Sequence, residues 1–170
     1  MNYRIESKES FEVFGIEWVF HIDGSGDMPK SPAQLWEQCH ANGEVKRLED
    51  NAGQLPSFVS EELYKAHGIC SYRNTGEGTF PYMICAFKGD SSITSGYQSV
   101  VVPANTWAIF RSELFTWDHF DNIIDTLYRR FYTEWLPTSG YELIGGAEME
   151  IYGKKSDLNF VELWFAVRKI

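Results

Sequence analysis

The sequence predicts an α+β fold in which an antiparallel sheet carries helices on one face. Eight short segments are apolar or alternate apolar with polar residues, as is typical of strands. Two longer segments place apolar residues at helical spacing instead. The order of elements is strands, helix and two strands, and then the same again. This repetition indicates two pseudo-symmetric βαββ modules within one domain, residues 1–170, with approximate halves 1–95 and 96–170.

The expected strands are bounded by segments rich in turn-forming residues. NTGEG (74–78) and GKKSDLN (153–159) are typical of hairpin loops. The predicted strands, in chain order, are Tyr3–Glu6, Phe11–His21, Gly68–Arg73, Tyr82–Phe87, Gln98–Val102, Thr106–Glu113, Gly146–Tyr152 and Phe160–Val167.

Three segments are predicted to be helical. The first begins at Ser31, a residue type that caps helices, continues with Pro32 in the first turn and ends near Gly43. The second, within 116–137, carries a long apolar stripe. A shorter third helix is expected over Ser60–His67.

Composition narrows the class of protein. With 15 Lys and Arg against 24 Asp and Glu, the formal charge is −9, which disfavours direct nucleic-acid binding. The three cysteines and four histidines lack the spacing of metal ligands. No segment resembles a signal peptide or approaches the roughly 18 apolar residues that cross a bilayer. We therefore expect a cytoplasmic protein with no metal, no cofactor and no membrane partner.

The segment FVELWFAV (160–167) combines a core-like strand with one acid. Read as a strand, it sends one set of residues to the helices, namely Val161, Leu163, Phe165 and Val167. Glu162 and Trp164 then point to the opposite, uncovered face. Because an acid among aromatic rings costs free energy unless it is paired, Glu162 is the strongest candidate for a functional residue.

Acids and aromatic rings are expected to gather on that uncovered face. On the preceding strand, Met149 and Ile151 would face the helices, and a second set would join Glu162: Glu148, Glu150 and Tyr152. Laying FPYMICAF (80–87) on FVELWFAV places Tyr82 at the position of Glu162. The result would be a concave cleft for a flat, positively charged molecule. The alternative for Glu148 and Glu150 is the solvated side of a half-buried strand.

Five segments resemble the GyrI-like small-molecule-binding domain, also called the bacterial transcription activator effector-binding domain. They are FPYMICAF (80–87), VPANTWAIF (102–110), EWLPTSGYEL (134–143), EMEIY (148–152) and FVELWFAV (160–167). The resemblance implies two βαββ modules around an aromatic-lined cleft and ligands that are often cationic and aromatic. It also implies that Glu162 is the key pocket residue, with aromatic walls at Trp107, Tyr152, Trp164 and Tyr82.

Three functions follow from the resemblance. The first is a stand-alone protein that binds hydrophobic, cationic aromatic compounds, since the chain starts almost directly with the domain and shows no preceding DNA-binding module. The second is a hydrolase of cyclopropane-bearing or similar electrophilic genotoxins, with Glu162 as the catalytic acid or base. The third is a module that contacts a protein partner such as gyrase, which rests on analogy and acidic charge alone.

Overall fold

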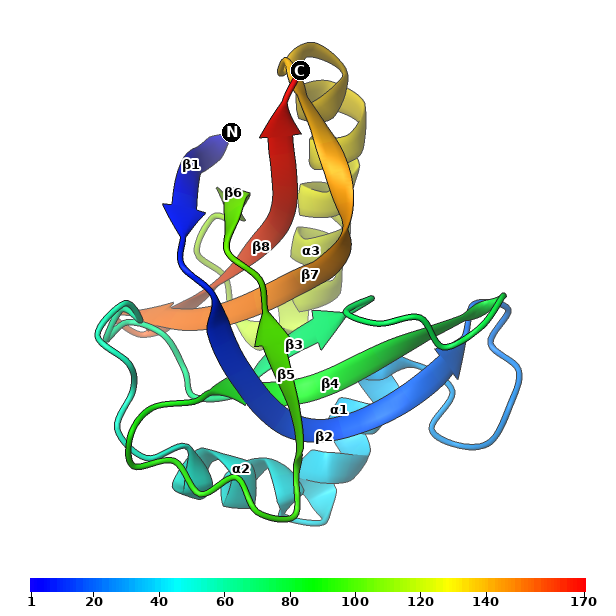
Figure 1. Ribbon diagram of the computed structural model, residues 1–170, viewed down its shortest axis with the longest axis vertical. Coiled ribbons are helices and arrows are strands. Elements are labelled where there is room, and N and C mark those ends of the chain that lie inside the picture. Colours follow the sequence, from blue (N-terminus) through cyan, green and yellow to red (C-terminus); the bar gives the residue numbers. More distant parts are fainter.

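Two long strands of the protein are each interrupted only by a short bend. β1 (Asn2–Lys8) continues into β2 (Phe11–His21), and β5 (Gln98–Val102) continues into β6 (Asn105–Arg111). The computed structural model describes residues 1–170 and assembles eight antiparallel strands in the order β1-β6-β8-β7-β3-β4-β2-β5 (Figure 1). The other elements are α1 (Pro32–Ala41), α2 (Glu44–Ala52), β3 (His67–Cys70), β4 (Thr79–Phe87), α3 (Phe120–Arg130), β7 (Tyr141–Lys155) and β8 (Leu158–Lys169). Short helical turns lie at Trp117–His119, Phe131–Trp135 and Leu136–Thr138.

The sheet confirms the two expected modules. β2, β4 and β3 belong to the first half, β6, β8 and β7 to the second, and β3 pairs with β7 at the centre. The halves exchange their edge strands, because β1 pairs with β6 and β5 pairs with β2. Both of these ladders share one register: Lys8 pairs with Asn105 and, three residues on, Phe11 pairs with Val102. The strand formed by β1 and β2 therefore pairs with the strand formed by β5 and β6 as one bent antiparallel ladder. This ladder curls the sheet back on itself (Figure 1).

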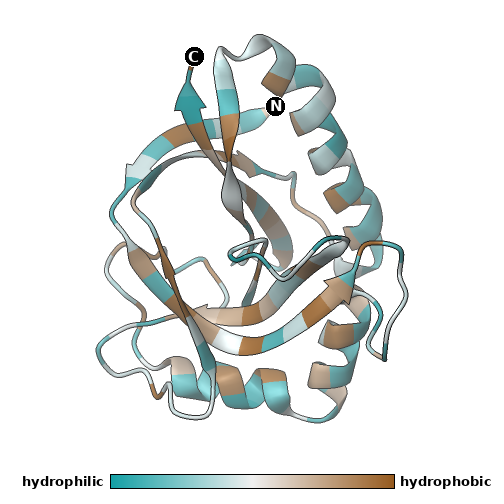
Figure 2. Ribbon diagram, turned by 45° about the vertical axis from the view of Figure 1, so that its right-hand side comes forward, coloured by the Kyte–Doolittle hydropathy of each residue, from teal (hydrophilic) through white to brown (hydrophobic).

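All three α-helices cover the same face of the sheet, which agrees with the prediction that helices lie on one face. α1 and α2 bury Leu35 and Leu48 against Phe14 and Ile84 in the first half. α3 buries its apolar stripe, which includes Leu127, against β6 and β8 in the second half. In Figure 2, hydrophobic and hydrophilic residues alternate along each helix, as expected of helices that bury one face only.

The predicted helix boundaries are partly confirmed. Ser31 caps α1, and its Oγ accepts a hydrogen bond from the backbone N–H of Gln34 at 3.3 Å. α2 was not expected: the sequence prediction stopped at Gly43, whose φ of 82° provides a left-handed link between two consecutive helices. The helix predicted over Ser60–His67 is wrong, because this segment forms turns that run directly into β3.

The predicted faces are right for β8 and wrong for β7. Val161, Leu163, Phe165 and Val167 do pack under α3. The β7–β8 hairpin, however, closes by a two-residue turn between Lys155 and Leu158, rather than by the expected seven-residue loop. Because the loop has an even instead of an odd number of residues, the register of β7 against β8 shifts by one residue and the two faces of β7 are exchanged. Ile151 therefore pairs with Glu162, and Glu150 pairs with Leu163. Glu148, Glu150 and Tyr152 therefore point toward the helices, whereas Met149 and Ile151 share the face of Trp164.

Tyr82 is also turned to the helices, so the proposed equivalence with Glu162 is wrong. In the central pair of strands, Ile69 of β3 is the ladder partner of Met149 of β7. Ile69 pairs in turn with Met83, and Met149 pairs with Trp164. Met83 is therefore the counterpart of Trp164, and the alignment of the two segments is off by one residue.

The face opposite the helices is filled rather than open. It holds a buried cluster that includes Trp107, Trp164, Met83 and Met149. The segment between α2 and β3 closes this face, because Leu55, Val59 and Leu63 pack against the same cluster. The concave cleft expected there is therefore replaced by core.

Candidate functional site

A cavity lies on the helix-bearing face, between the helices of the two halves. It has a volume of about 620 Å³, within the range of small-molecule sites. The cavity is formed by both helices of the first half, the start of α3, the segment before β3 and one strand of the central pair. Its lining residues are Ala33, Trp36, His40, Val45, Glu49, Tyr64, Ala66, Trp117, Phe120, Asp121 and Tyr152.

Aromatic rings surround Tyr152 at the floor of this cavity. The ring of Trp36 meets that of Tyr152 edge-on at 5.7 Å between centroids. Phe120 and Trp117 approach the same ring at 5.9 Å and 6.1 Å. These side chains come from α1, from the short turn Trp117–His119 and the beginning of α3, and from β7, so only the tertiary fold brings them together. The cavity offers flat apolar surfaces, which favour an aromatic ligand.

A hydrogen-bonded network supports the cavity wall from behind. The Tyr152 hydroxyl donates to Glu150, and the Tyr128 hydroxyl donates to the same carboxylate at 3.1 Å. Burial raises the pKa of Glu150, and the two phenol donors only partly oppose this effect. Trp36 Nε1 donates to the Tyr82 hydroxyl at 2.7 Å, which holds the indole in place.

Glycine at position 68 makes room for this network. Gly68 lies on β3 directly opposite Glu150. A Cβ atom at this position would lie 2.4 Å from the Tyr82 hydroxyl oxygen, which is closer than van der Waals contact allows. The absence of a side chain here therefore permits Tyr82 to reach Trp36.

Glu162 lies on the opposite face of the sheet and is engaged in ion pairs. Its side chain is 1% exposed, and its Oε1 accepts from Arg4 Nη1 and from Arg111 Nη2, each at 2.8 Å. Trp164 Nε1 donates to Oε2 at 2.9 Å. Burial alone would raise the pKa of Glu162, but the hydrogen bonds from Arg4 and Trp164 and the nearby guanidinium charges bring it below its ordinary value. The carboxylate is thus neutralised by neighbours and does not line the cavity.

The remaining predicted site residues divide between the two faces. Trp107 and Trp164 lie 6.0 Å apart in the buried cluster away from the cavity, and Lys8 Nζ covers the Trp164 ring at 4.7 Å. Tyr152 lines the cavity, and Glu150 and Tyr82 lie in the network behind it. The sequence analysis missed four lining rings: Trp36, Tyr64, Trp117 and Phe120. Trp117 and Phe120 lie three residues apart, a helical spacing that core residues share, and no pattern in the sequence links Trp36 or Tyr64 to them.

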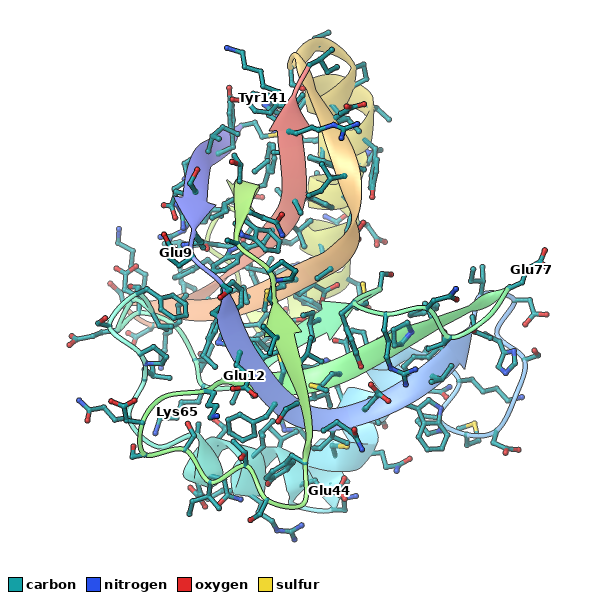
Figure 3. The ribbon with its side chains drawn as sticks, in the orientation of Figure 1. Glu9, Glu12, Glu44, Lys65, Glu77 and Tyr141 are labelled. Atoms are coloured by element: carbon teal, nitrogen blue, oxygen red, sulfur yellow. The ribbon has the colours of Figure 1, made fainter.

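Charged groups elsewhere are distributed over the surface. Figure 3 shows Lys65 and Glu77 at the periphery of the molecule. No group of His, Cys, Asp and Glu side chains could hold a metal ion. No helix is long and apolar enough to span a membrane.

An aromatic cavity between the two halves of a βαββ duplication defines a small-molecule-binding domain of the effector-binding type. The family model described as integron-associated effector binding protein, Cass2, matches residues 4–167. The chain belongs to this family, and the GyrI-like resemblance is confirmed. None of the curated proteins matches the chain.

Solved structures share this fold at low sequence identity. SAV2435 bound to tetraphenylphosphonium is 14% identical with a TM-score of 0.73, over 99% of this chain and 94% of that one. A bacterial transcription regulation protein from Staphylococcus aureus MU50 is 16% identical with a TM-score of 0.69, over 99% of both chains. The integron cassette protein VCH_CASS2 from Vibrio cholerae is 18% identical with a TM-score of 0.59, over 98% and 95%.

Proposed function

We propose that the protein binds hydrophobic, cationic aromatic small molecules in the cavity between its helices and thereby sequesters or senses xenobiotics. The observation that carries the proposal is the cavity of about 620 Å³ whose aromatic rings converge on Tyr152. Aromatic faces attract cations, and each desolvated contact contributes about 2 kcal/mol. Several such contacts suffice for micromolar affinity. Membership of an effector-binding family supports the same function.

In this proposal Tyr152, Trp36, Trp117 and Phe120 contact the ligand. Glu150 and Tyr82 hold the wall from behind. Glu162 has a structural role, because its carboxylate is already paired with two arginines on the other face. Trp107 and Trp164 form part of the buried cluster that supports the sheet.

Tetraphenylphosphonium is the first probe, since SAV2435 was solved with this cation. Its binding is measured by quenching of tryptophan fluorescence, and tetraphenylborate, which has the same shape and opposite charge, tests the role of charge. Trp117→Ala removes a ring that lines the cavity and is 52% exposed, so the fold should tolerate the change. We expect its affinity for the cation to fall about tenfold.

Trp18→Ala is the matched control, because Trp18 is 36% exposed and lies outside the cavity. It should leave the affinity unchanged. Equal affinities of the wild type and Trp117→Ala, or stronger binding of tetraphenylborate than of the cation, would show that the ligand site is not this cavity or does not prefer cations.

Hydrolysis of a strained electrophile is a second candidate function, and one observation favours it. Glu150 has a raised pKa and accepts a hydrogen bond from the Tyr152 hydroxyl, which borders the cavity. A carboxyl group with a raised pKa can act as a general acid or base at neutral pH. Mass spectrometry of the protein with a cyclopropane-bearing alkylator decides the matter. If the protein is a hydrolase, the amount of hydrated alkylator must exceed the amount of protein, and the Tyr152→Phe variant must form none. Stoichiometric binding of the alkylator without hydrated product would exclude an enzymatic function.

A further inference from the structure

We propose that Glu49 and Asp121, at the mouth of the cavity, select ligands that carry a localised cationic group at one end of an aromatic body. The inference rests on the proposed function of the cavity and specifies the polarity and orientation of its ligand. The aromatic end would lie deep, against Tyr152, and the cationic group would lie at the mouth.

The burial of the lining residues defines the direction of the cavity. Val45, Ala66 and Tyr152 are buried and form its deep end, which has no formal charge. Glu49 is half-buried and Asp121 is exposed, so both carboxylates border the outer part. A ligand that placed its charge at the deep end would lose hydration there without meeting a carboxylate in the lining.

The two carboxylates are available for a ligand. Neither takes part in any of the ion pairs of the structure. Glu49 comes from α2 in the first half and Asp121 from α3 in the second half, so the mouth is negative on both sides. Two negative charges that lie outside any ion pair and beside an apolar cavity attract a cation and repel an anion.

Glu150 and Glu162 cannot take this role without rearrangement. Glu150 is not part of the lining, and its two oxygens each accept a hydrogen bond from a phenol, Tyr152 and Tyr128. Glu162 is paired with arginines on the far face. The only other ionisable group that lines the outer part and could oppose a cation is His40, which stacks on Trp36 at 5.7 Å.

Two compounds of the same shape test the inference. 4-Biphenylmethylamine carries a terminal ammonium, and 4-biphenylmethanol replaces it with a neutral hydroxyl. Isothermal titration calorimetry compares both compounds on the wild type and on Glu49→Gln/Asp121→Asn. Exposed charge pairs contribute only modestly to affinity, so the double variant should bind the amine roughly fivefold more weakly. The alcohol should bind both proteins equally, and raising the salt concentration should weaken only the amine.

The matched control is Glu37→Gln/Asp125→Asn, which removes the same net charge from exposed positions on α1 and α3 outside the cavity. It should leave the affinity for the amine within twofold of the wild type. The inference is overturned if the two double variants lose the same affinity for the amine, or if the mouth variant loses equal affinity for the amine and the alcohol. If neither compound binds the wild type and Trp117→Ala has no effect on tetraphenylphosphonium, the cavity proposal fails, and the role of the mouth fails with it.

Discussion

Replacement of Glu162 by glutamine separates a structural role from a ligand-binding role. Glu162 is 1% exposed and accepts hydrogen bonds from Arg4, Arg111 and Trp164. Removing one partner of a fully buried ion pair costs about 3–5 kcal/mol. The side chains of Arg4 and Arg111 are 40% and 26% exposed, so water compensates part of this loss. We therefore expect Glu162→Gln to destabilise the protein by about 2–3 kcal/mol.

Thermal unfolding measures this effect directly. For a chain of this length, each kcal/mol corresponds to about 2–4 °C, so the midpoint should fall by about 5–10 °C. The affinity for tetraphenylphosphonium, measured well below the unfolding transition, should stay within twofold of the wild type. Glu12→Gln is the control, because it breaks an ion pair with Lys88 in which the side chains are 31% and 43% exposed. This variant should lose less than about 1 kcal/mol.

The pH dependence provides a further check on Glu162. Its pKa is lowered in the folded protein, so its contribution to stability is present above the pKa of the unfolded chain and is lost as the pH falls through the folded value. The difference between the wild type and Glu162→Gln should therefore shrink in acid. If Glu162→Gln keeps the wild-type midpoint and loses tenfold or more in affinity, the ligand site lies on the face of Glu162 and the cavity assignment is refuted.

Three more changes test the network and the core. Gly68→Ala places a Cβ 2.4 Å from the Tyr82 hydroxyl oxygen, so urea unfolding should show a loss of about 1–3 kcal/mol; wild-type stability would mean that Tyr82 moves freely. Glu150→Gln should stabilise the protein at pH 8 but not at pH 4, because a raised folded pKa gives stability that is lost as the pH rises through it; the same difference at both pH values would contradict the raised pKa. Phe131→Ala removes a ring stacked on Phe165 at 3.7 Å between centroids, and should cost about 3–5 kcal/mol by calorimetry, whereas a loss below 1 kcal/mol would indicate a loosely packed contact.

Local patterns were sufficient for the architecture and for most elements, with α2 and the turns before β3 as the exceptions. Ser31 and Pro32 begin α1 because a capping hydroxyl and a fixed φ favour a helix start there. Apolar residues at alternate positions of β8 identified the face under α3. The repeated order of elements indicated the two modules, which the pairing of β3 with β7 confirms.

The site was harder to predict because it depends on which residues of different elements share a face. Alternation along β7 shows two faces but does not say which of them meets the helices. The turn between Lys155 and Leu158 decides this, and it differs by an odd number of residues from the expected loop. Tyr152 consequently lines a cavity among the helices, whereas Glu162 lies on the far face beside Arg4.

The amino-acid sequence was enough to identify the α+β class, the internal duplication, the effector-binding family and the special character of an acid at position 162. These properties depend on local periodicity, capping and short motifs, which are encoded by neighbouring residues. The three-dimensional packing was needed to show that Arg4 and Arg111 neutralise Glu162, and that Trp36, Trp117 and Tyr152 line a cavity. These contacts join residues far apart in the chain, and the register of each strand pair and the placement of each helix determine whether they form.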